Sequence, residues 1–505
     1  MTGVTTRLSE LLHAAGIVPL APIGPDPEIR GAALDSRRVG PGEIFFALAG
    51  LRANGLDFVP QAIERGASAV VADGPRPEWL CGDVAWVHVA QPRHAAALLS
   101  RECWGRPDEA LTLVGITGTN GKTTVAHLVH AIAAAAGRRA GRIGTVGYAF
   151  AGIERPGSRT TPESPDLYRL LAEMRDEAID FVSMEVSSHA LAQQRVFGMR
   201  FATAAFLNLG RDHLDFHDTI EEYFQAKLLL FESLEPDRWA VLPADDEYGA
   251  RIADRIRSRV LRFGRSAAAD VRLVQEHSSL EGSSAVLQTP VGSLPVRTFL
   301  LGPFNLDNVA AAAACAIALG IPPEAVTAGV VSVASVPGRM EPVDRGQPFR
   351  VLVDYAHTEQ ALRNVVGWLT QQIRGQVRLV FGCGGDRDHG KRAEMGRAAA
   401  ESGAVLYVTT DNPRREDPAE ILRGISVGVT AVPGADARTS WILDREEAIH
   451  TAIAQAAADD VILLAGKGHE TSQTFQDREV PFDDRAVAEQ ALRARGWAGG
   501  GRCLS

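Results

Sequence analysis

Short apolar runs alternate along most of the chain with segments of helical periodicity, and several runs end in a polar or glycine-rich turn. This pattern is typical of parallel strands joined by crossover helices. The chain is therefore expected to adopt an α/β fold, with functional loops at the carboxyl ends of the strands. The expected strands are residues 44–48, 111–116, 181–184, 204–207, 239–242, 351–354, 377–381, 405–409 and 461–465.

Two junctions containing glycine and proline interrupt the pattern, near residues 107 and 337. The length of 505 residues also exceeds one ordinary core and favours about three domains. We expect a small N-terminal α/β domain over residues 1–107, a central domain with a mostly parallel sheet over 108–336, and a Rossmann-like, doubly wound domain over 337–505.

Composition narrows the class of protein. Hydrophobic residues make up 46% of the chain and charged residues 23%, which is ordinary for a globular protein, and no apolar run is long enough to span a membrane. The formal net charge of −10 disfavours general attraction to nucleic acid. The five cysteines are scattered, and the N-terminus lacks the apolar stretch of a secretion signal. We expect a cytoplasmic protein with reduced thiols, no membrane span and no nucleic-acid partner.

A glycine-rich turn joins an expected strand to an expected helix, with the sequence Gly-Ile-Thr-Gly-Thr-Asn-Gly-Lys-Thr-Thr. Small residues let backbone N–H groups converge on an anion, Lys122 reaches terminal phosphates, and the Thr123 hydroxyl is placed to ligate Mg²⁺. Ile116 stands where the common pattern has its first glycine. The alternative is a glycine-rich turn that only connects a strand to a helix and binds no phosphate. The turn favours ATP or GTP and a P-loop ATPase-like central domain. The expected nucleotide-binding residues are Gly118, Thr119, Asn120, Gly121, Lys122, Thr123 and Thr124.

Acidic and imidazole side chains follow the next strands. Glu185 ends an apolar strand, and a carboxylate beside a phosphate loop is a natural Mg²⁺ ligand, although a helix-capping acid has the same pattern. His213 and His217 lie four apart, which leaves a zinc site open as an alternative. On composition alone, Lys227 is a lysine on a helix face whose charge reaches water.

Together these motifs resemble the Mur ligases, the ATP-dependent amide-forming enzymes of peptidoglycan precursor synthesis, and the resemblance covers nearly the whole chain. It implies that residues 118–123 bind ATP, that Glu185 binds one Mg²⁺ and that His213 binds a second. It also implies that Lys227 is carbamylated, which turns a cation into an anionic ligand bridging the metals. A carboxylate-like group suits hard Mg²⁺, whereas an ammonium would repel it.

Later segments resemble nucleotide-contacting motifs of the same family. Asn308 ends a segment whose last asparagine contacts adenine in the family. Arg339 and Asp354 match two interdomain motifs that contact the nucleotide, although an arginine there is also open to being an ordinary surface charge. His357 is the candidate base that frees the attacking amine. The catalytic residues implied are Lys122, Lys227, His213 and His357.

Three segments of the last domain, residues 381–388, 411–414 and 465–470, resemble the pocket of Mur ligases that add meso-diaminopimelate. Arg414 would hold the second carboxylate of that amino acid bidentately, and Glu470 would face an ammonium. By composition, Asp-Asn-Pro-Arg is also a plain turn. The residues implied are Arg387, Asp411, Asn412, Pro413, Arg414, Gly466 and Glu470.

Other positions match family contacts to the nucleotide-sugar peptide. Ser36 matches a uridine-side contact in the first domain, although a serine in a turn is more often a local cap. The remaining matches are Thr160, Thr161, Ser187, Gln193 and Arg195.

The resemblance thus implies a monomeric ligase, dependent on ATP and Mg²⁺, that adds meso-diaminopimelate to UDP-N-acetylmuramoyl-L-alanyl-D-glutamate through an acyl phosphate. Its three domains would bind UDP, ATP and the amino acid in that order along the chain. The alternatives are a ligase of the same type that adds L-lysine, a folylpolyglutamate-type ligase, and a P-loop switch without ligase activity. The switch would leave His213, Lys227 and the third domain without a role.

Overall fold

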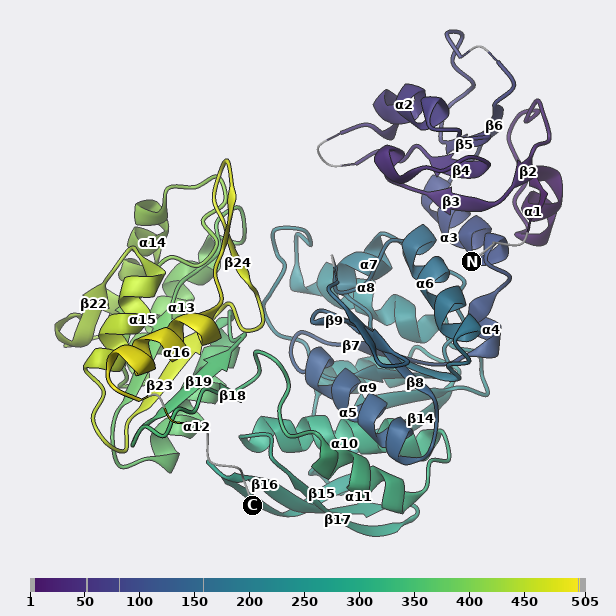
Figure 1. Ribbon diagram of the computed structural model, residues 1–505. Helices are drawn as coiled ribbons and strands as arrows, with labels where there is room; N and C mark the ends of the chain where they lie inside the picture. The colour runs from purple at the N-terminus through teal and green to yellow at the C-terminus, as the bar shows by residue number, and fades with distance from the viewer. Residues whose placement is uncertain (1–4, 51–52, 81, 158, 498, 500–505) are drawn as a thin grey trace.

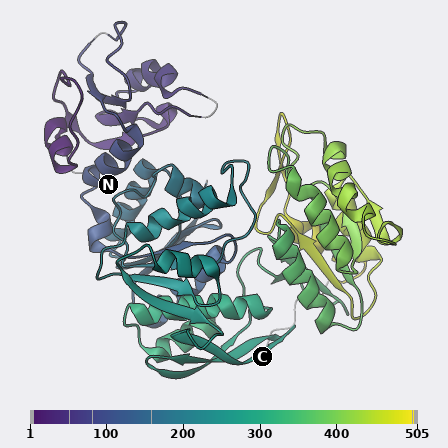
Figure 2. The same cartoon turned by 180° about the vertical axis from the view of Figure 1, so that it is seen from behind.

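The computed structural model describes residues 5–50, 53–80, 82–157, 159–497 and 499. Sheets of four, eleven and six strands divide these residues into an N-terminal, a central and a C-terminal unit. In Figure 1 the N-terminal unit, in purple, sits at one end of the teal central unit, while the C-terminal unit, green to yellow, lies along another side. Figure 2 shows the same arrangement from behind.

The N-terminal unit is built on a parallel sheet in the order β3-β4-β5-β6. Successive side chains of β4 point to opposite faces, so Phe45 packs in one apolar core and Phe46 in another. Its elements are β1 (Thr6–Arg7), α1 (Leu8–Ala14), β2 (Glu28–Ile29), β3 (Gly31–Ala33), η1 (Ser36–Arg38), β4 (Glu43–Phe46), η2 (Gly55–Phe58), α2 (Val59–Glu64), β5 (Ala69–Ala72), β6 (Ala85–His88) and α3 (Pro92–Cys103).

The first part of the central unit supplies the middle of its sheet. Strands β8, β11, β7 and β12 are neighbours and run parallel, so their carboxyl ends meet at one edge. These elements are α4 (Pro107–Ala110), β7 (Thr112–Thr117), α5 (Lys122–Ala135), β8 (Ala140–Gly144), β9 (Gly147–Phe150), β10 (Ile153–Arg155), α6 (Ser164–Asp176), β11 (Phe181–Glu185), α7 (Ser188–Ala192), β12 (Thr203–Phe206) and α8 (Ile220–Glu232).

The second part extends the same sheet, whose full order is β10-β9-β8-β11-β7-β12-β13-β14-β15-β16-β17. Antiparallel strands close both edges. Helices α5, α10 and α11 share a core on one face, and α6 and α8 pack on the other. The added elements are β13 (Trp239–Pro243), α9 (Glu247–Ala253), β14 (Arg259–Gly264), β15 (Val271–Ser279), β16 (Gly282–Thr289), β17 (Gly292–Thr298), α10 (Pro303–Ala318) and α11 (Pro323–Ser332).

The C-terminal unit has the sheet order β18-β19-β23-β20-β21-β22, parallel except for β18. Helices α12, α13 and α14 cover one face, and α15 and α16 the other. Its elements are β18 (Glu341–Pro342), β19 (Arg350–Asp354), α12 (Glu359–Gln372), β20 (Val377–Phe381), α13 (Gly390–Glu401), β21 (Val405–Val408), α14 (Pro418–Thr430), η3 (Asp436–Arg438), β22 (Thr439–Trp441), α15 (Arg445–Ala454), β23 (Val461–Ala465), β24 (Ser472–Thr474), β25 (Glu479–Pro481) and α16 (Asp484–Ala494).

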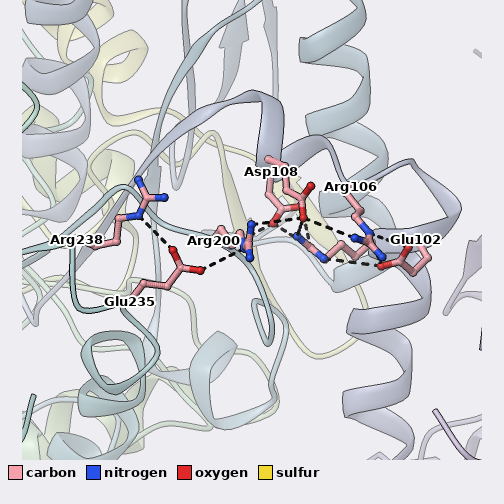
Figure 3. A network of polar contacts seen from close by, with 8 residues as sticks. Glu102, Arg106, Asp108, Arg200, Glu235 and Arg238 are labelled. Atoms are coloured by element: carbon pink, nitrogen blue, oxygen red, sulfur yellow. Dashed lines mark hydrogen bonds and ion pairs between the residues drawn. The ribbon is translucent and has the colours of Figure 1, made fainter. Parts of the chain in front are cut away.

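The N-terminal and central units share one apolar core, which runs from Leu99 and Trp104 to Leu113 and Leu171. Where the chain passes between the two units, an ionic network surrounds α4; Figure 3 shows Asp108, Glu102 and Arg106 on one side and Arg200 and Glu235 on the other. These two units are therefore tied together by both apolar and ionic contacts.

The predicted α/β class is confirmed, and each of the nine predicted strands has a counterpart, from β4 to β23. The other strands of the described residues were not predicted from the sequence. Among them, β14 to β17 have exposed positions that give them a mixed polar and apolar character. No helix among the described residues has both the length and the apolar character needed to span a bilayer.

Candidate functional site

A cavity of about 470 Å³ lies between the central and C-terminal units. One wall is the edge where β7, β11 and β12 end, and the facing wall comes from the segments around β19. The cavity brings together all but Gly118 of the residues that the sequence predicted for ATP, metal and catalysis, and also Thr160 and Ser187, which were predicted for the nucleotide-sugar peptide. Those on its wall are Thr119, Asn120, Gly121, Lys122, Thr123, Thr124, Thr160, Glu185, Ser187, His213, Lys227, Asn308, Arg339, Asp354 and His357.

The loop between β7 and α5 has the backbone of a phosphate cradle. Gly118 and Gly121 adopt φ values of 154° and 89°, which favour glycine, and α5 begins at Lys122. The backbone N–H of Asn120 donates to Asn208 Oδ1 at 2.9 Å and ties the loop to the segment after β12. Lys122 Nζ donates to two carbonyls of the loop at 2.8 and 2.9 Å, and burial lowers its pKa. A cation beside a helix N-terminus suits a phosphate group.

Glu185, at the end of β11, is buried among hydroxyl groups. Its Oε2 accepts hydrogen bonds from Thr123 Oγ1 at 3.1 Å and Thr145 Oγ1 at 2.9 Å, and its Oε1 accepts one from Thr145 N at 2.8 Å. Thr160 Oγ1 lies 3.0 Å from Thr145 Oγ1. A carboxylate beside a hydroxyl at a phosphate loop offers the hard oxygens that Mg²⁺ takes together with phosphate and water, so these residues fit the metal. Thr145 was not predicted, although it follows the end of β8.

The Asp212 carboxylate lies between two imidazole rings that come from different units. Its Oδ2 lies 3.5 Å from His213 Nε2 and 3.4 Å from His357 Nε2. Burial holds the pKa of His213 well below its ordinary value, so its ring is neutral at neutral pH. A neutral imidazole is able to bind a metal or accept a proton.

Within the described residues, no three His, Cys, Asp or Glu side chains gather as a ready metal cluster. A metal at Glu185 or His213 would therefore also use hydroxyl, phosphate and water oxygens.

Lys227 lies on α8, beneath the phosphate loop, and is only 1% exposed. Its Nζ donates to the Gly118 carbonyl at 3.0 Å and lies 4.3 Å from the centroid of the Tyr223 ring. Burial, reinforced by Lys122, lowers the pKa of Lys227 well below its ordinary value. The alternative of a lysine that carries its charge into water is wrong, because the helix face that holds Lys227 is turned toward the site.

The C-terminal unit reaches the phosphate loop directly. Arg339 Nη2 donates to Thr123 Oγ1 at 3.0 Å. Asp354 accepts two backbone N–H groups at 2.8 Å each, and burial raises its pKa. Asn308, on α10, lies so close over the loop that a Cβ on Gly121 would be 2.4 Å from Asn308 Oδ1.

The residues predicted for the nucleotide-sugar peptide form two groups. Arg195 donates to the Thr161 carbonyl at 2.9 Å and to Gln193 Oε1 at 2.6 Å, and the Thr161 hydroxyl lies 3.4 Å from Ser187 Oγ. Ser36 lies apart from them, in η1 of the N-terminal unit and away from the cavity wall.

The predicted amino-acid residues lie beyond the cavity wall, in the loops after β20, β21 and β23. Arg414 has a φ of 53°, and its Nη1 donates to the Gly385 carbonyl at 2.7 Å. Asn412 Nδ2 donates to Glu470 Oε2 at 2.7 Å. The Pro413 carbonyl packs against Gly385 so closely that a Cβ there would lie 1.9 Å from it. Burial lowers the pKa of Arg414.

Gly466 and Arg387 complete the predicted pocket. Gly466 has a φ of 112°, and a Cβ there would lie 2.9 Å from Asp411 Oδ2. Arg387 Nη1 lies 3.2 Å from Asp215 Oδ2, so this arginine spans the gap to the central unit.

The sequence did not predict the end of the cavity around β14 and α10. Phe263, Phe304 and Arg265 line it, and Arg265 Nη2 lies 2.7 Å from Glu276 Oε2. Arg265 follows the carboxyl end of β14, which is the signal that would have identified it.

Three parts of the chain match Mur ligase domains. Residues 28–103 match the Mur ligase family catalytic domain, residues 116–316 the Mur ligase middle domain and residues 338–468 the Mur ligase glutamate ligase domain.

Curated relatives match almost end to end. The UDP-N-acetylmuramoyl-L-alanyl-D-glutamate–2,6-diaminopimelate ligase of Solibacter usitatus is 45% identical over 494 residues, which cover 97% of this chain and 99% of the relative. The ligase of the same name from Geobacillus kaustophilus is 44% identical, over 94% and 96%. A solved structure of a ligase of this name has a TM-score of 0.67 at 31% identity and covers 98% of this chain and 100% of its own.

Proposed function

The chain belongs to the Mur ligase family, and on that premise we propose that it joins meso-diaminopimelate to UDP-N-acetylmuramoyl-L-alanyl-D-glutamate while ATP is cleaved to ADP and phosphate. The observation that carries the proposal is that the loops of the C-terminal unit bring one cation, Arg414, and one carboxylate, Glu470, close enough for their charges to interact, which suits an amino acid whose far end has a carboxylate and an ammonium. The relatives' names support the same pair of substrates.

Each unit has a distinct role in the proposal. Residues 1–107 bind the UDP end, residues 108–336 bind ATP and Mg²⁺, and residues 337–505 bind the amino acid. The proposed enzyme is a monomer in the cytoplasm, where ATP is available.

The first step transfers a phosphoryl group. A carboxylate oxygen of the glutamate attacks the γ-phosphorus of ATP, the bond to the bridging oxygen breaks, and ADP leaves an acyl phosphate behind. Lys122 and the backbone N–H groups of the loop hold the phosphate oxygens as charge shifts to ADP. Arg339 adds a second cation from the C-terminal unit. Magnesium would neutralise phosphate charge when bound, with Thr123 and Glu185 as ligands of one ion and His213 as a ligand of a second.

Lys227 is proposed to act as a carbamate. Its lowered pKa increases the share of neutral amine, and the nitrogen of this form attacks carbon dioxide with loss of a proton. The product is an anion close to the phosphate loop, with the charge that a metal site needs.

The second step forms the amide. The amine of meso-diaminopimelate attacks the acyl carbon, a tetrahedral intermediate forms, and phosphate leaves. His357 is the proposed proton acceptor. Its Nδ1 lies 2.7 Å from the Tyr355 carbonyl, which only accepts, so in the neutral ring Nδ1 carries the proton and Nε2 has the lone pair. Asp212, 3.4 Å from Nε2, would stabilise the cation that results.

The test is phosphate release by the purified protein with ATP, Mg²⁺ and UDP-N-acetylmuramoyl-L-alanyl-D-glutamate. The proposal expects release that depends on meso-diaminopimelate and is much weaker with L-lysine. A preference for L-lysine would overturn the role of Arg414. Release that needs no amino acid would favour a nucleotide switch over a ligase.

A further inference from the structure

Lysine is rare in this chain, and its positions are not scattered. Of 52 lysine and arginine residues only four are lysines, namely Lys122, Lys227, Lys391 and Lys467. The first two donate to the phosphate loop, and Lys391 donates to the His357 carbonyl at 3.3 Å. An ammonium is a compact centre with three donors, unlike a planar guanidinium. In a chain that otherwise uses arginine, each lysine marks a place that needs this compact geometry.

Lys467 is fully buried in the turn that follows β23. Its Nζ donates to Asn412 Oδ1 at 3.2 Å, to Glu470 Oε2 at 3.1 Å and to the Ser472 carbonyl at 2.5 Å. These three acceptors match the three N–H groups of the ammonium. A buried charge is tolerated only when it is paired and hydrogen-bonded, as here, so Lys467 is part of the framework of the pocket.

Lys467 fixes which way the Asn412 amide faces. An ammonium and a backbone N–H only donate, and both Lys467 Nζ and Thr474 N, at 3.1 Å, approach the same atom of Asn412. That atom must be the oxygen, so the NH₂ group of Asn412 is turned toward Glu470.

Lys467 and Asn412 also select one oxygen of Glu470. Both donate to Oε2, at 3.1 and 2.7 Å. In the part of the chain that the structure describes, no donor reaches Oε1. The Glu470 side chain is 32% exposed, so Oε1 is the oxygen that a ligand ammonium meets.

We infer that Lys467 is a positioning residue that sets the amino-acid preference of this pocket, by orienting Asn412 and occupying one oxygen of Glu470. The inference rests on the proposed function, because it concerns the amino acid added there. A positive charge beside Glu470 disfavours a ligand end that carries only an ammonium, as L-lysine does. An end with an ammonium and a carboxylate is neutral overall, and its carboxylate faces Arg414.

The neighbouring buried ion pair, Arg445 with Asp484, does not contact Glu470. Arg445 and Asp484 form a closed, fully buried pair at 2.7 Å, and Arg445 also donates to the Ala465 carbonyl at 3.0 Å. Among the described residues, Lys467 is the cation in contact with Glu470.

The test measures kcat/KM for meso-diaminopimelate and for L-lysine in the parent enzyme and in Lys467→Met. Methionine keeps most of the volume and removes the charge, so the ratio of the two kcat/KM values should fall about tenfold or more in favour of L-lysine. A purely structural role would lower both values and leave their ratio unchanged. A ratio that stays within about twofold of the parent's, or no L-lysine turnover in either enzyme, overturns the inference.

The double variant Lys467→Met with Glu470→Gln removes both charges of the pair and leaves no unpaired carboxylate, so it is the variant to measure if the single variant does not fold. Its ratio should return toward that of the parent, and a ratio that stays at the single variant's value counts against the inference. Arg378→Met is the matched control, because it removes a cation from a pair at 2.8 Å in the same unit, at the other end of the sheet. It should lower stability without moving the ratio.

Failure of the proposed function and failure of the role of Lys467 give different results. If the parent enzyme shows no dependence on meso-diaminopimelate, the proposed function fails. If the parent prefers it and Lys467→Met keeps that preference, only the role of Lys467 fails.

Discussion

At the scale of single residues, Arg414 shows how the chain prepares a side chain for an anion. Its backbone is left-handed, and its Nη1 is anchored on the Gly385 carbonyl at 2.7 Å. A guanidinium carries its five donors in one rigid plane, so this single contact sets the direction of the remaining N–H groups. A lysine at the same position would keep the charge and lose the plane.

Arg414→Lys should therefore lower kcat/KM for meso-diaminopimelate by about tenfold to a hundredfold, because a charge-assisted, two-point contact becomes a single one. The KM for ATP should not change. Arg415→Lys is the control, since Arg415 is 62% exposed at its side chain and pairs with Asp386 at the surface. Steady-state kinetics with each substrate varied in turn would check this, and an equal loss for every substrate would indicate that Arg414 only supports the loop.

The buried lysine on α8 gives a dependence of stability on pH. Lys227 has a pKa well below its ordinary value of 10.5, mainly because of burial, and the unfolded chain regains the ordinary value. Between the two pKa values the unfolded state binds a proton that the folded state does not, so stability should rise with pH across that window. Lys122 acts in the same direction.

Lys227→Met should flatten this rise and increase Tm at neutral pH, by about 2–4 °C for each kcal/mol of desolvation that the substitution removes. The measurement is thermal unfolding from neutral pH to about pH 10 in buffer free of carbon dioxide, where the lysine stays unmodified. A slope as steep in the variant as in the parent would show that Lys227 is not the group responsible. Activity should be lost in the variant at every pH.

At the scale of elements, helix α5 carries a left-handed glycine beside each end. Gly121 has a φ of 89° and Gly137 a φ of 77°. Their surroundings differ, because a Cβ on Gly121 would meet Asn308 and Leu207, whereas a Cβ on Gly137 would meet nothing within 4 Å. Backbone strain is thus common to both positions, and crowding at the nucleotide site belongs to the first alone.

Gly121→Ala should raise the KM for ATP about tenfold or more, because the new methyl group displaces Asn308 and distorts the cradle. Gly137→Ala should lower the free energy of unfolding by about 1–2 kcal/mol through the left-handed backbone and leave the KM for ATP unchanged. Nucleotide titrations together with denaturant unfolding separate the two effects. Equal KM values in the two variants would contradict the close approach of Asn308 to the loop.

The sequence predicted best those features that depend on a single strand and the turn that follows it. The ends of β7, β11 and β19 were predicted because apolar runs stop at polar turns. Glu185 was predicted from such an end and Lys122 from the glycine-rich motif, whereas Asp354 was predicted from the family resemblance. The burial of Lys227 could not be predicted, because it depends on how α8 is turned against the phosphate loop. Strands β14 to β17 were not predicted because they too depend on packing between elements: the helices that cover them determine which of their positions are apolar.

At the scale of the whole molecule, the three units are not equally independent. A single apolar core spans the N-terminal and central units, whereas the two cores of the C-terminal sheet consist almost entirely of its own residues, with Leu301 as the member from the central unit. The ionic network of Figure 3 lies at the passage between the first two units. Its centre is Asp108, with a side chain that is 0% exposed and accepts from Arg101 Nε at 2.9 and 3.0 Å and from Arg200 N at 3.2 Å.

Asp108→Ala should lower the free energy of unfolding by about 3–5 kcal/mol, because it leaves the buried Arg101 guanidinium without its main partner. Since the first two units share a core, their amides should lose protection together, while those of the C-terminal unit keep theirs. Hydrogen exchange read peptide by peptide measures this, with the exposed Asp237→Ala as the control that should change little. Loss of protection confined to the N-terminal unit would mean that the shared core does not couple the first two units. Loss of protection in both would show that they unfold as one cooperative unit, and that the C-terminal unit is a separate body able to move against them.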